Sequence, residues 1–116
     1  MRFIKALPLD ALKPGQCRAV ELEGGYGVAL CNVEGEIFAL DNTCPHAGGP
    51  LGEGTLRGDI VECPWHGWKF HVRTGQRVKN PSPEWTIPRY AVKVEDGMIQ
   101  VSIPLSTPPD QGEASD

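Results

Sequence analysis

Two short motifs in the middle of the chain each pair a cysteine with a histidine. Cys44 and His46 are separated by one residue, Cys63 and His66 by two, and sixteen residues lie between the motifs. Thiolates and imidazoles are the ligands that transition metals of intermediate softness prefer. Two loops, each with one sulfur and one nitrogen donor, therefore predict a metal centre with mixed ligands.

Both zinc and an iron–sulfur cluster accept two cysteines and two histidines. Zinc sites usually combine C-x₂₋₄-C with H-x₃₋₅-H, whereas cysteine and histidine alternate here. In the Rieske type of [2Fe–2S] centre, two histidines replace two cysteines on one of the two irons. The prolines and glycines in both loops also suit backbone N–H groups bent toward sulfur. The pattern favours the cluster, and a zinc-stabilised binding module is the less favoured alternative.

At these residues the chain resembles the Rieske ferredoxin family, whose signature is C-x-H followed by C-x-x-H. Residues 46–54 look like the first ligand loop of that family and residues 62–70 like the second. Thr74-Gly75 resembles the following turn, and residues 81–83 the proline-containing loop over the cluster. The resemblance covers about residues 2–103 and implies one [2Fe–2S] cluster held by Cys44, His46, Cys63 and His66.

The elements that position these loops are predicted to be short strands. Apolar stretches separated by Gly, Pro, Asp and Asn indicate strands over residues 3–7, 18–22, 26–33, 37–40, 60–62, 69–72, 91–94 and 98–103. No helical period persists over ten residues. The expected fold is all-β, a small antiparallel barrel or sandwich with an inserted loop-rich cluster-binding subdomain. Its ligand loops are expected at about residues 41–58 and 62–70.

Length and composition are those of one domain, predicted over residues 1–103, with a disordered tail over residues 104–116. No apolar run is long enough to cross a bilayer and none resembles a secretory signal, so a cytoplasmic protein is expected. The net charge of −4 argues against nucleic acid as a partner. Cys17 and Cys31 are interpreted as buried free thiols, His71 as a surface or strand histidine, and Arg73 as a solvated strand residue.

The residues around the ligands predict a low reduction potential by comparison with the family. High-potential members carry an extra cysteine in each loop, where this chain has Gly48 and Trp65, so no disulfide joins the loops. They also carry a serine and a tyrosine that donate hydrogen bonds to sulfur, where this chain has Trp68 and Phe70. Fewer such bonds lower the potential. Trp65, Trp68 and Trp85 are expected to pack in the core rather than to shield the cluster.

Three classes of function follow from the resemblance. The first is an electron carrier between a reductase and a terminal oxygenase or similar enzyme, which is not itself an enzyme. The second is the small subunit of an NADH-dependent nitrite reductase. The third, an oxygenase, is rejected because it needs a further iron on two histidines and a carboxylate. The chain has three histidines, two of them already assigned, and no length for a second domain.

Overall fold

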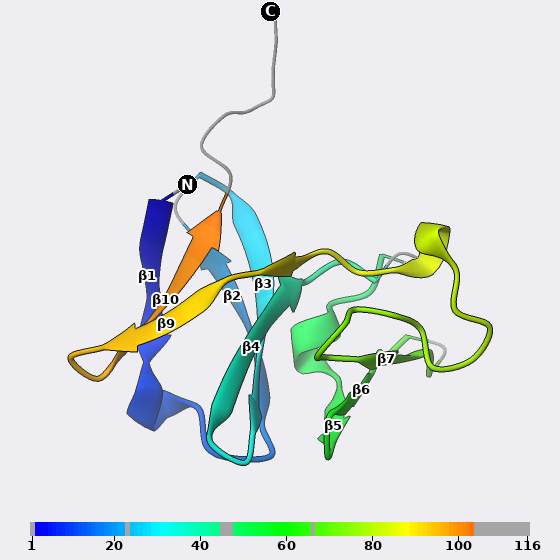
Figure 1. Ribbon diagram of the computed structural model, residues 1–116, viewed down its shortest axis with the longest axis horizontal. Coiled ribbons are helices and arrows are strands. Elements are labelled where there is room, and N and C mark those ends of the chain that lie inside the picture. The colour runs from blue at the N-terminus through cyan, green and yellow to red at the C-terminus, as the bar shows by residue number, and fades with distance from the viewer. Residues whose placement is uncertain (1, 23, 45–47, 66, 104–116) are drawn as a thin grey trace, which may run out of the picture.

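The computed structural model describes residues 2–22, 24–44, 48–65 and 67–103, which form an all-β structure (Figure 1). Short turns of 3-10 helix occur at η1 (Leu9–Ala11), η2 (Leu51–Glu53) and η3 (Pro83–Trp85). The strands are β1 (Arg2–Pro8), β2 (Cys17–Leu22), β3 (Tyr26–Val33), β4 (Glu36–Asp41), β5 (Thr55–Arg57), β6 (Ile60–Glu62), β7 (Lys69–His71), β8 (Arg89–Tyr90), β9 (Val92–Glu95) and β10 (Met98–Ile103).

The strands form three antiparallel sheets. Two of them make a base: β1-β10-β9 and β2-β3-β4-β8. The third sheet, β5-β6-β7, comes from the segment between β4 and β8 and lies beside the base (Figure 1). The predicted all-β antiparallel fold with an inserted subdomain is thereby confirmed. No helix in the described part of the chain is long and apolar enough to cross a membrane.

Two tight turns fix the register of the base. Glu34 and Gly35 join β3 to β4, and both have positive φ, 53° and 99°. Asp96 and Gly97 join β9 to β10 in the same way, with φ of 54° and 73°. Two-residue turns with both φ values positive match the right-handed twist of paired strands. The local sequence therefore sets which residues of these hairpins face each other.

Strand β3 separates two apolar cores because it is buried on both faces. Ala29, Cys31 and Val33 face one side, and Val28 and Leu30 face the other. The loop-side core, under the inserted subdomain, comprises Ala29, Cys31, Val33, Leu40, Cys44, Leu51, Val61, Cys63, Phe70, Val72 and Ile87. The base core comprises Leu7, Leu12, Leu22, Val28, Leu30, Ala39, Ile99, Val101 and Ile103.

Some short elements were not expected from the sequence. β5 was predicted as the end of a loop, and β8 has only two residues, Arg89 and Tyr90, paired with β4. β8 depends on pairing with a segment distant in the sequence, whereas β5 forms a local hairpin with β6 across the turn at Gly58 and Asp59. The predicted tail, residues 104–116, lies outside the described residues.

Arg73 links the inserted subdomain to the base and is therefore more than a solvated residue. Its Nη1 lies 3.1 Å from Glu36 Oε1, at the start of β4, and its Nε lies 3.3 Å from Asp59 Oδ2, in the β5–β6 turn. Its guanidinium carbon also lies 5.1 Å from the centre of the Phe38 ring. All three side chains of the ion pairs are substantially exposed, so their role is to orient the subdomain more than to stabilise it.

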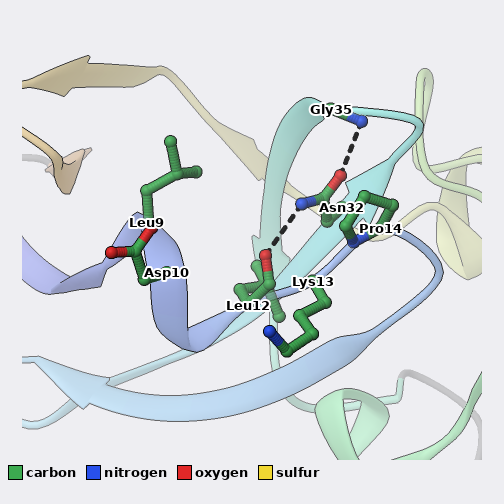
Figure 2. A pocket seen from close by; sticks show the side chains of 7 residues that line it. All are labelled: Leu9, Asp10, Leu12, Lys13, Pro14, Asn32 and Gly35. Atoms are coloured by element: carbon green, nitrogen blue, oxygen red, sulfur yellow. Dashed lines mark hydrogen bonds between the residues drawn. The ribbon is translucent and has the colours of Figure 1, made fainter.

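Asn32 is one of the few buried polar side chains and joins two turns of the base (Figure 2). Its Nδ2 donates to the Leu12 carbonyl at 2.8 Å, and its Oδ1 accepts from the Gly35 N–H at 2.7 Å. Asn32 thus holds the segment after η1 against the β3–β4 turn.

We expect Asn32→Ala to lower the free energy of unfolding by about 1–3 kcal/mol, because it leaves the buried Leu12 carbonyl and the partly buried Gly35 N–H without their partners. Thermal unfolding of the cluster-loaded protein measures the loss. The control is Lys13→Ala, because Lys13 is exposed and lines the same pocket as Asn32 (Figure 2). This substitution should change the free energy of unfolding little. Equal effects of the two substitutions would contradict the assigned role.

Candidate metal centre

The structure brings two of the four predicted ligands together. Cys44 lies in the segment after β4, and Cys63 directly follows β6. Both side chains are 1% exposed and belong to the loop-side core. The two thiols are close enough to hydrogen-bond with each other. His46 and His66, the predicted nitrogen ligands, lie outside the described residues.

Two backbone hydrogen bonds join Cys44 to glycines that follow it in the sequence. The Cys44 N–H donates to the Gly49 carbonyl at 3.0 Å, and the Gly48 N–H donates to the Cys44 carbonyl at 2.8 Å. Gly48 has a φ of 75°, which a residue with a side chain rarely adopts. The two hydrogen bonds hold the Cys44 backbone against that of Gly48 and Gly49.

The loop of Cys63 is closed in a similar way. The Cys63 N–H donates to the Trp68 carbonyl at 2.8 Å. Gly67, which has a φ of 73°, allows the chain to turn back between these residues. The Trp65 N–H donates to the Cys63 sulfur from within this loop. Each cysteine therefore lies in a short loop whose backbone closes on itself.

Glycine allows the two loops to touch. A Cβ on Gly49 would lie 2.8 Å from Cγ of Trp65 and 3.0 Å from Sγ of Cys63. Any larger residue would push the second loop away from the first. Gly49 therefore permits the Cys63 sulfur to approach the first loop closely.

Asn42, which was not predicted to position the site, anchors the first loop to the base. Its side-chain Oδ1 accepts from the Gly52 N–H at 2.7 Å, and its carbonyl accepts from the Leu51 N–H at 2.8 Å. Gly52 also lies so close to β2 that a Cβ there would be 2.6 Å from Cα of Ala19. The first loop thus rests directly on the backbone of the base. Only the position of Asn42 just before the cysteine could have indicated this role.

The burial and closeness of the two thiols favour a cation bound between them. Burial raises the pKa of Cys63, the Trp65 N–H opposes this, and the neighbouring Cys44 raises the pKa further. Two buried thiolates so close together repel each other unless a positive charge lies between them. Metal ions supply such a charge and deprotonate the thiols that bind them. The residues present therefore fit an iron–sulfur group.

The three tryptophans differ in their surroundings. Trp65 is 50% exposed, so the prediction that it packs in the core is wrong. Trp68 is partly buried between Arg77, whose guanidinium carbon lies 3.3 Å from the ring centre, and Trp85, with 5.1 Å between ring centres. Sequence reasoning did not single out Arg77, because its contact with Trp68 depends on the fold. Trp65 instead lies at the surface of the two loops, beside Gly49.

The remaining titratable residues add no second site. Among the described residues, no three His, Cys, Asp or Glu side chains gather in a way that could hold a metal ion. His71 is half-buried on β7 opposite Ile60, in agreement with its interpretation as a strand histidine. The two cysteine loops are therefore the candidate metal centre of the described part of the chain.

The chain matches the model of the family described as Rieske [2Fe-2S] domain over residues 2–94. It is 42% identical over 96 residues to the biphenyl dioxygenase ferredoxin subunit of Pseudomonas sp. (strain KKS102), which covers 82% of this chain and 86% of that protein. This match is to a complete small protein of similar length.

Solved structures agree with these matches. A ferredoxin of Sphingomonas yanoikuyae B1 superposes with a TM-score of 0.80 at 34% identity, covering 89% of this chain and all of that one. A complex of reduced oxygenase and oxidised ferredoxin in carbazole 1,9a-dioxygenase gives a TM-score of 0.77 at 33% identity, covering 85% of this chain and 100% of that one. A putative NADH-dependent nitrite reductase small subunit from Mycobacterium tuberculosis gives a TM-score of 0.77 at 28% identity, covering 90% of this chain and 97% of that one.

Proposed function

The chain belongs to the Rieske [2Fe–2S] domain family, and we propose that it carries single electrons from a reductase to a terminal oxygenase. The observation that carries this proposal is the convergence of Cys44 and Cys63 in one buried core, within the segment that matches the family. The family's [2Fe–2S] cluster exchanges electrons without bond-making chemistry on a substrate. We therefore expect an electron-transfer component and not an enzyme.

Cys44, His46, Cys63 and His66 are the proposed ligands. The two thiolates hold the cluster from inside the loop-side core, where burial excludes water from sulfur. The histidines are assigned from the motif, because each follows its cysteine in the same loop. Trp65, half exposed beside Gly49 and Cys63, covers the loops where a partner would approach.

The proposed partners are a reductase as donor and an oxygenase as acceptor. A similar ferredoxin forms a complex with its oxygenase, and a similar subunit belongs to a biphenyl dioxygenase. We place the carrier in the cytoplasm, because a reducing compartment suits the four cysteines, which are free thiols. The proposed domain spans residues 1–103.

A relay assay tests the function. The cluster-loaded protein is added to a Rieske dioxygenase system from which its own ferredoxin has been omitted, and product formation is measured against protein concentration. We expect product to rise with added protein, and the zinc-loaded protein to give none. Failure with several reductase–oxygenase pairs that a similar ferredoxin serves would contradict the oxygenase assignment.

A second candidate, the small subunit of a nitrite reductase, is favoured by the likeness to the mycobacterial protein. Subunits and free carriers differ in how tightly they bind their partners. Co-purification with a large sirohaem subunit would support this second candidate. Rapid exchange with a separate reductase would support the free carrier.

The reduction potential is expected in the lower part of the Rieske range of about −150 to +300 mV. Phe70 is fully buried in the same core as Cys44 and Cys63 and has no hydroxyl. We expect Phe70→Tyr to raise the potential by about 60–130 mV, because a hydrogen bond to charged sulfur stabilises the reduced state by about 1.5–3 kcal/mol.

Spectroelectrochemical titration measures this shift. Phe38→Tyr is the control, because Phe38 packs on the edge of the same core and contacts Arg73. An unchanged potential in Phe70→Tyr would show that a hydroxyl at this position does not reach sulfur. A potential near the top of the range in the unmodified protein would contradict the low-potential assignment.

A further inference from the structure

Cys17 and Cys31 lie directly opposite each other in neighbouring strands. Cys17 on β2 pairs with Cys31 on β3, and their Sγ atoms are 2.9 Å apart. One step along the ladder, the Asn32 N–H donates to the Gln16 carbonyl. Hydrogen-bonded and non-hydrogen-bonded pairs alternate along an antiparallel ladder, so the two cysteines occupy a non-hydrogen-bonded pair.

A non-hydrogen-bonded pair has the backbone spacing that a disulfide needs. Its Cα atoms are about 4.5 Å apart and its side chains approach most closely, and disulfides span Cα separations of about 4.4–6.8 Å. Both thiols are free in the structure, and both are separate from the proposed metal ligands. Closing the bond therefore requires no rearrangement of the strands.

The two thiols differ in access. Cys31 is fully buried, whereas Cys17 is only partly buried. Cys17 also lines a polar hollow of about 420 Å³ between β2 and the start of β5, together with Arg18 and Thr55. A small polar oxidant can therefore approach Cys17 from this hollow, whereas Cys31 is fully buried.

We propose that Cys17 and Cys31 form a reversible disulfide when the protein meets a peroxide. The Cys17 thiol loses its proton and its sulfur attacks one peroxide oxygen. The O–O bond breaks, Cys17 becomes a sulfenic acid, and the leaving hydroxide takes up a proton to give the first water. The Cys31 sulfur then attacks the Cys17 sulfur, the S–O bond breaks, and the proton of Cys31 leaves with the oxygen as water. In sum, two thiols and hydrogen peroxide give one disulfide and two water molecules.

The order of these steps follows from the surroundings of the two sulfurs. The hydrogen bond to Cys17 and burial raise the pKa of the Cys31 thiol, so Cys31 remains protonated while Cys17 is oxidised. Cys31 lies within hydrogen-bonding distance of Cys17, which favours closure of the disulfide over further oxidation of the sulfenic acid.

The disulfide joins strands on which the metal centre rests. Ala19, two residues after Cys17, is in close contact with Gly52 of the first ligand loop. Cys31 belongs to the same buried core as Cys44 and Cys63. Oxidation at this pair therefore fixes β2 against β3 beneath the loop, without using a sulfur that binds the cluster.

The test treats the cluster-loaded protein with hydrogen peroxide, then denatures it in acid and alkylates the free thiols. Intact mass and peptide mapping identify the oxidised residues. We expect two fewer alkylated thiols than in the untreated protein, a peptide linking Cys17 to Cys31, and full reversal by dithiothreitol. The visible spectrum of the cluster, recorded before denaturation, should be unchanged. The variants Cys17→Ser and Cys31→Ser should not form this link.

Other results would overturn the proposal. The first is that Cys17 and Cys31 both remain open to alkylation at peroxide concentrations that leave the cluster intact. The second is that Cys17 is oxidised to sulfinic acid without a disulfide. The third is a disulfide that contains Cys44 or Cys63. A second measurement needs no variant: equilibrating the loaded protein in glutathione buffers gives the fraction of disulfide. No disulfide even in the most oxidising buffer would likewise overturn the proposal.

Discussion

Cys63→Ser should abolish binding of the [2Fe–2S] cluster, with iron falling from about two atoms per chain to nearly none. Cys63 is 1% exposed and adjacent to Cys44, and the other cysteine of this core, Cys31, is paired with Cys17 on β2. A serine hydroxyl is a harder and far less acidic ligand than a thiol, and it would remain protonated in this buried position.

Iron and acid-labile sulfide analysis and the visible spectrum measure the loss. The matched control is Cys31→Ser, the same substitution in the same buried core. It should retain the full iron content. Equal loss in both variants would indicate that the core, and not a ligand, had been disrupted. Full iron content in Cys63→Ser would remove Cys63 from the ligand set.

Ligation by both cysteine and histidine should be visible in the electron paramagnetic resonance spectrum. Electron paramagnetic resonance of the dithionite-reduced protein should give a rhombic signal, with an average g-value below that of clusters held by four cysteines. A sample without such a signal that contains stoichiometric zinc would contradict the cluster assignment for His46 and His66 as well as for the cysteines.

Gly54→Ala is expected to be the most damaging substitution that does not touch a ligand. A Cβ on Gly54 would overlap with the carbonyl oxygen of Glu62, the residue immediately before Cys63. Backbone atoms cannot yield as a flexible side chain can. Moving the Glu62 carbonyl shifts Cys63 and breaks the pairing of β5 with β6, at a cost of about 3 kcal/mol or more.

Thermal unfolding of the loaded protein should show a midpoint lower by roughly 10 °C or more, together with a reduced iron content. Gly27→Ala is the control, because the nearest atom to its Cβ would be that of Asn42 at 3.6 Å, an ordinary contact. We expect Gly27→Ala to change the free energy of unfolding by less than about 1 kcal/mol. A midpoint for Gly54→Ala as high as that of Gly27→Ala would contradict the close approach.

The fold was predictable where the local sequence carries the information. Apolar stretches bounded by turn residues predicted β3, β4, β9 and β10, because turns such as Glu34-Gly35 and Asp96-Gly97 have few alternative geometries. The two-residue strand β8 was missed, since Arg89 and Tyr90 become a strand only by pairing with β4.

The candidate site was predictable for a different reason. The types and spacing of Cys44 and Cys63 indicated a shared metal, and the structure places their side chains together. The pairing of Cys17 with Cys31 was missed, because thirteen residues lie between them and only the register of β2 and β3 places them opposite each other. The exposure of Trp65 was also missed, since its position depends on Gly49, a residue of the other loop.

The pairing of the first and last described strands has a practical consequence. Arg2 lies opposite Ile103 in the β1–β10 ladder. The start of β1 and the end of β10 lie at the end of the base away from the inserted subdomain (Figure 1). A tether to an electrode, attached at either strand end, would leave the ligand loops facing solution. The same adjacency allows the two ends to be joined by a short linker, so new termini could be opened elsewhere in a circular permutant.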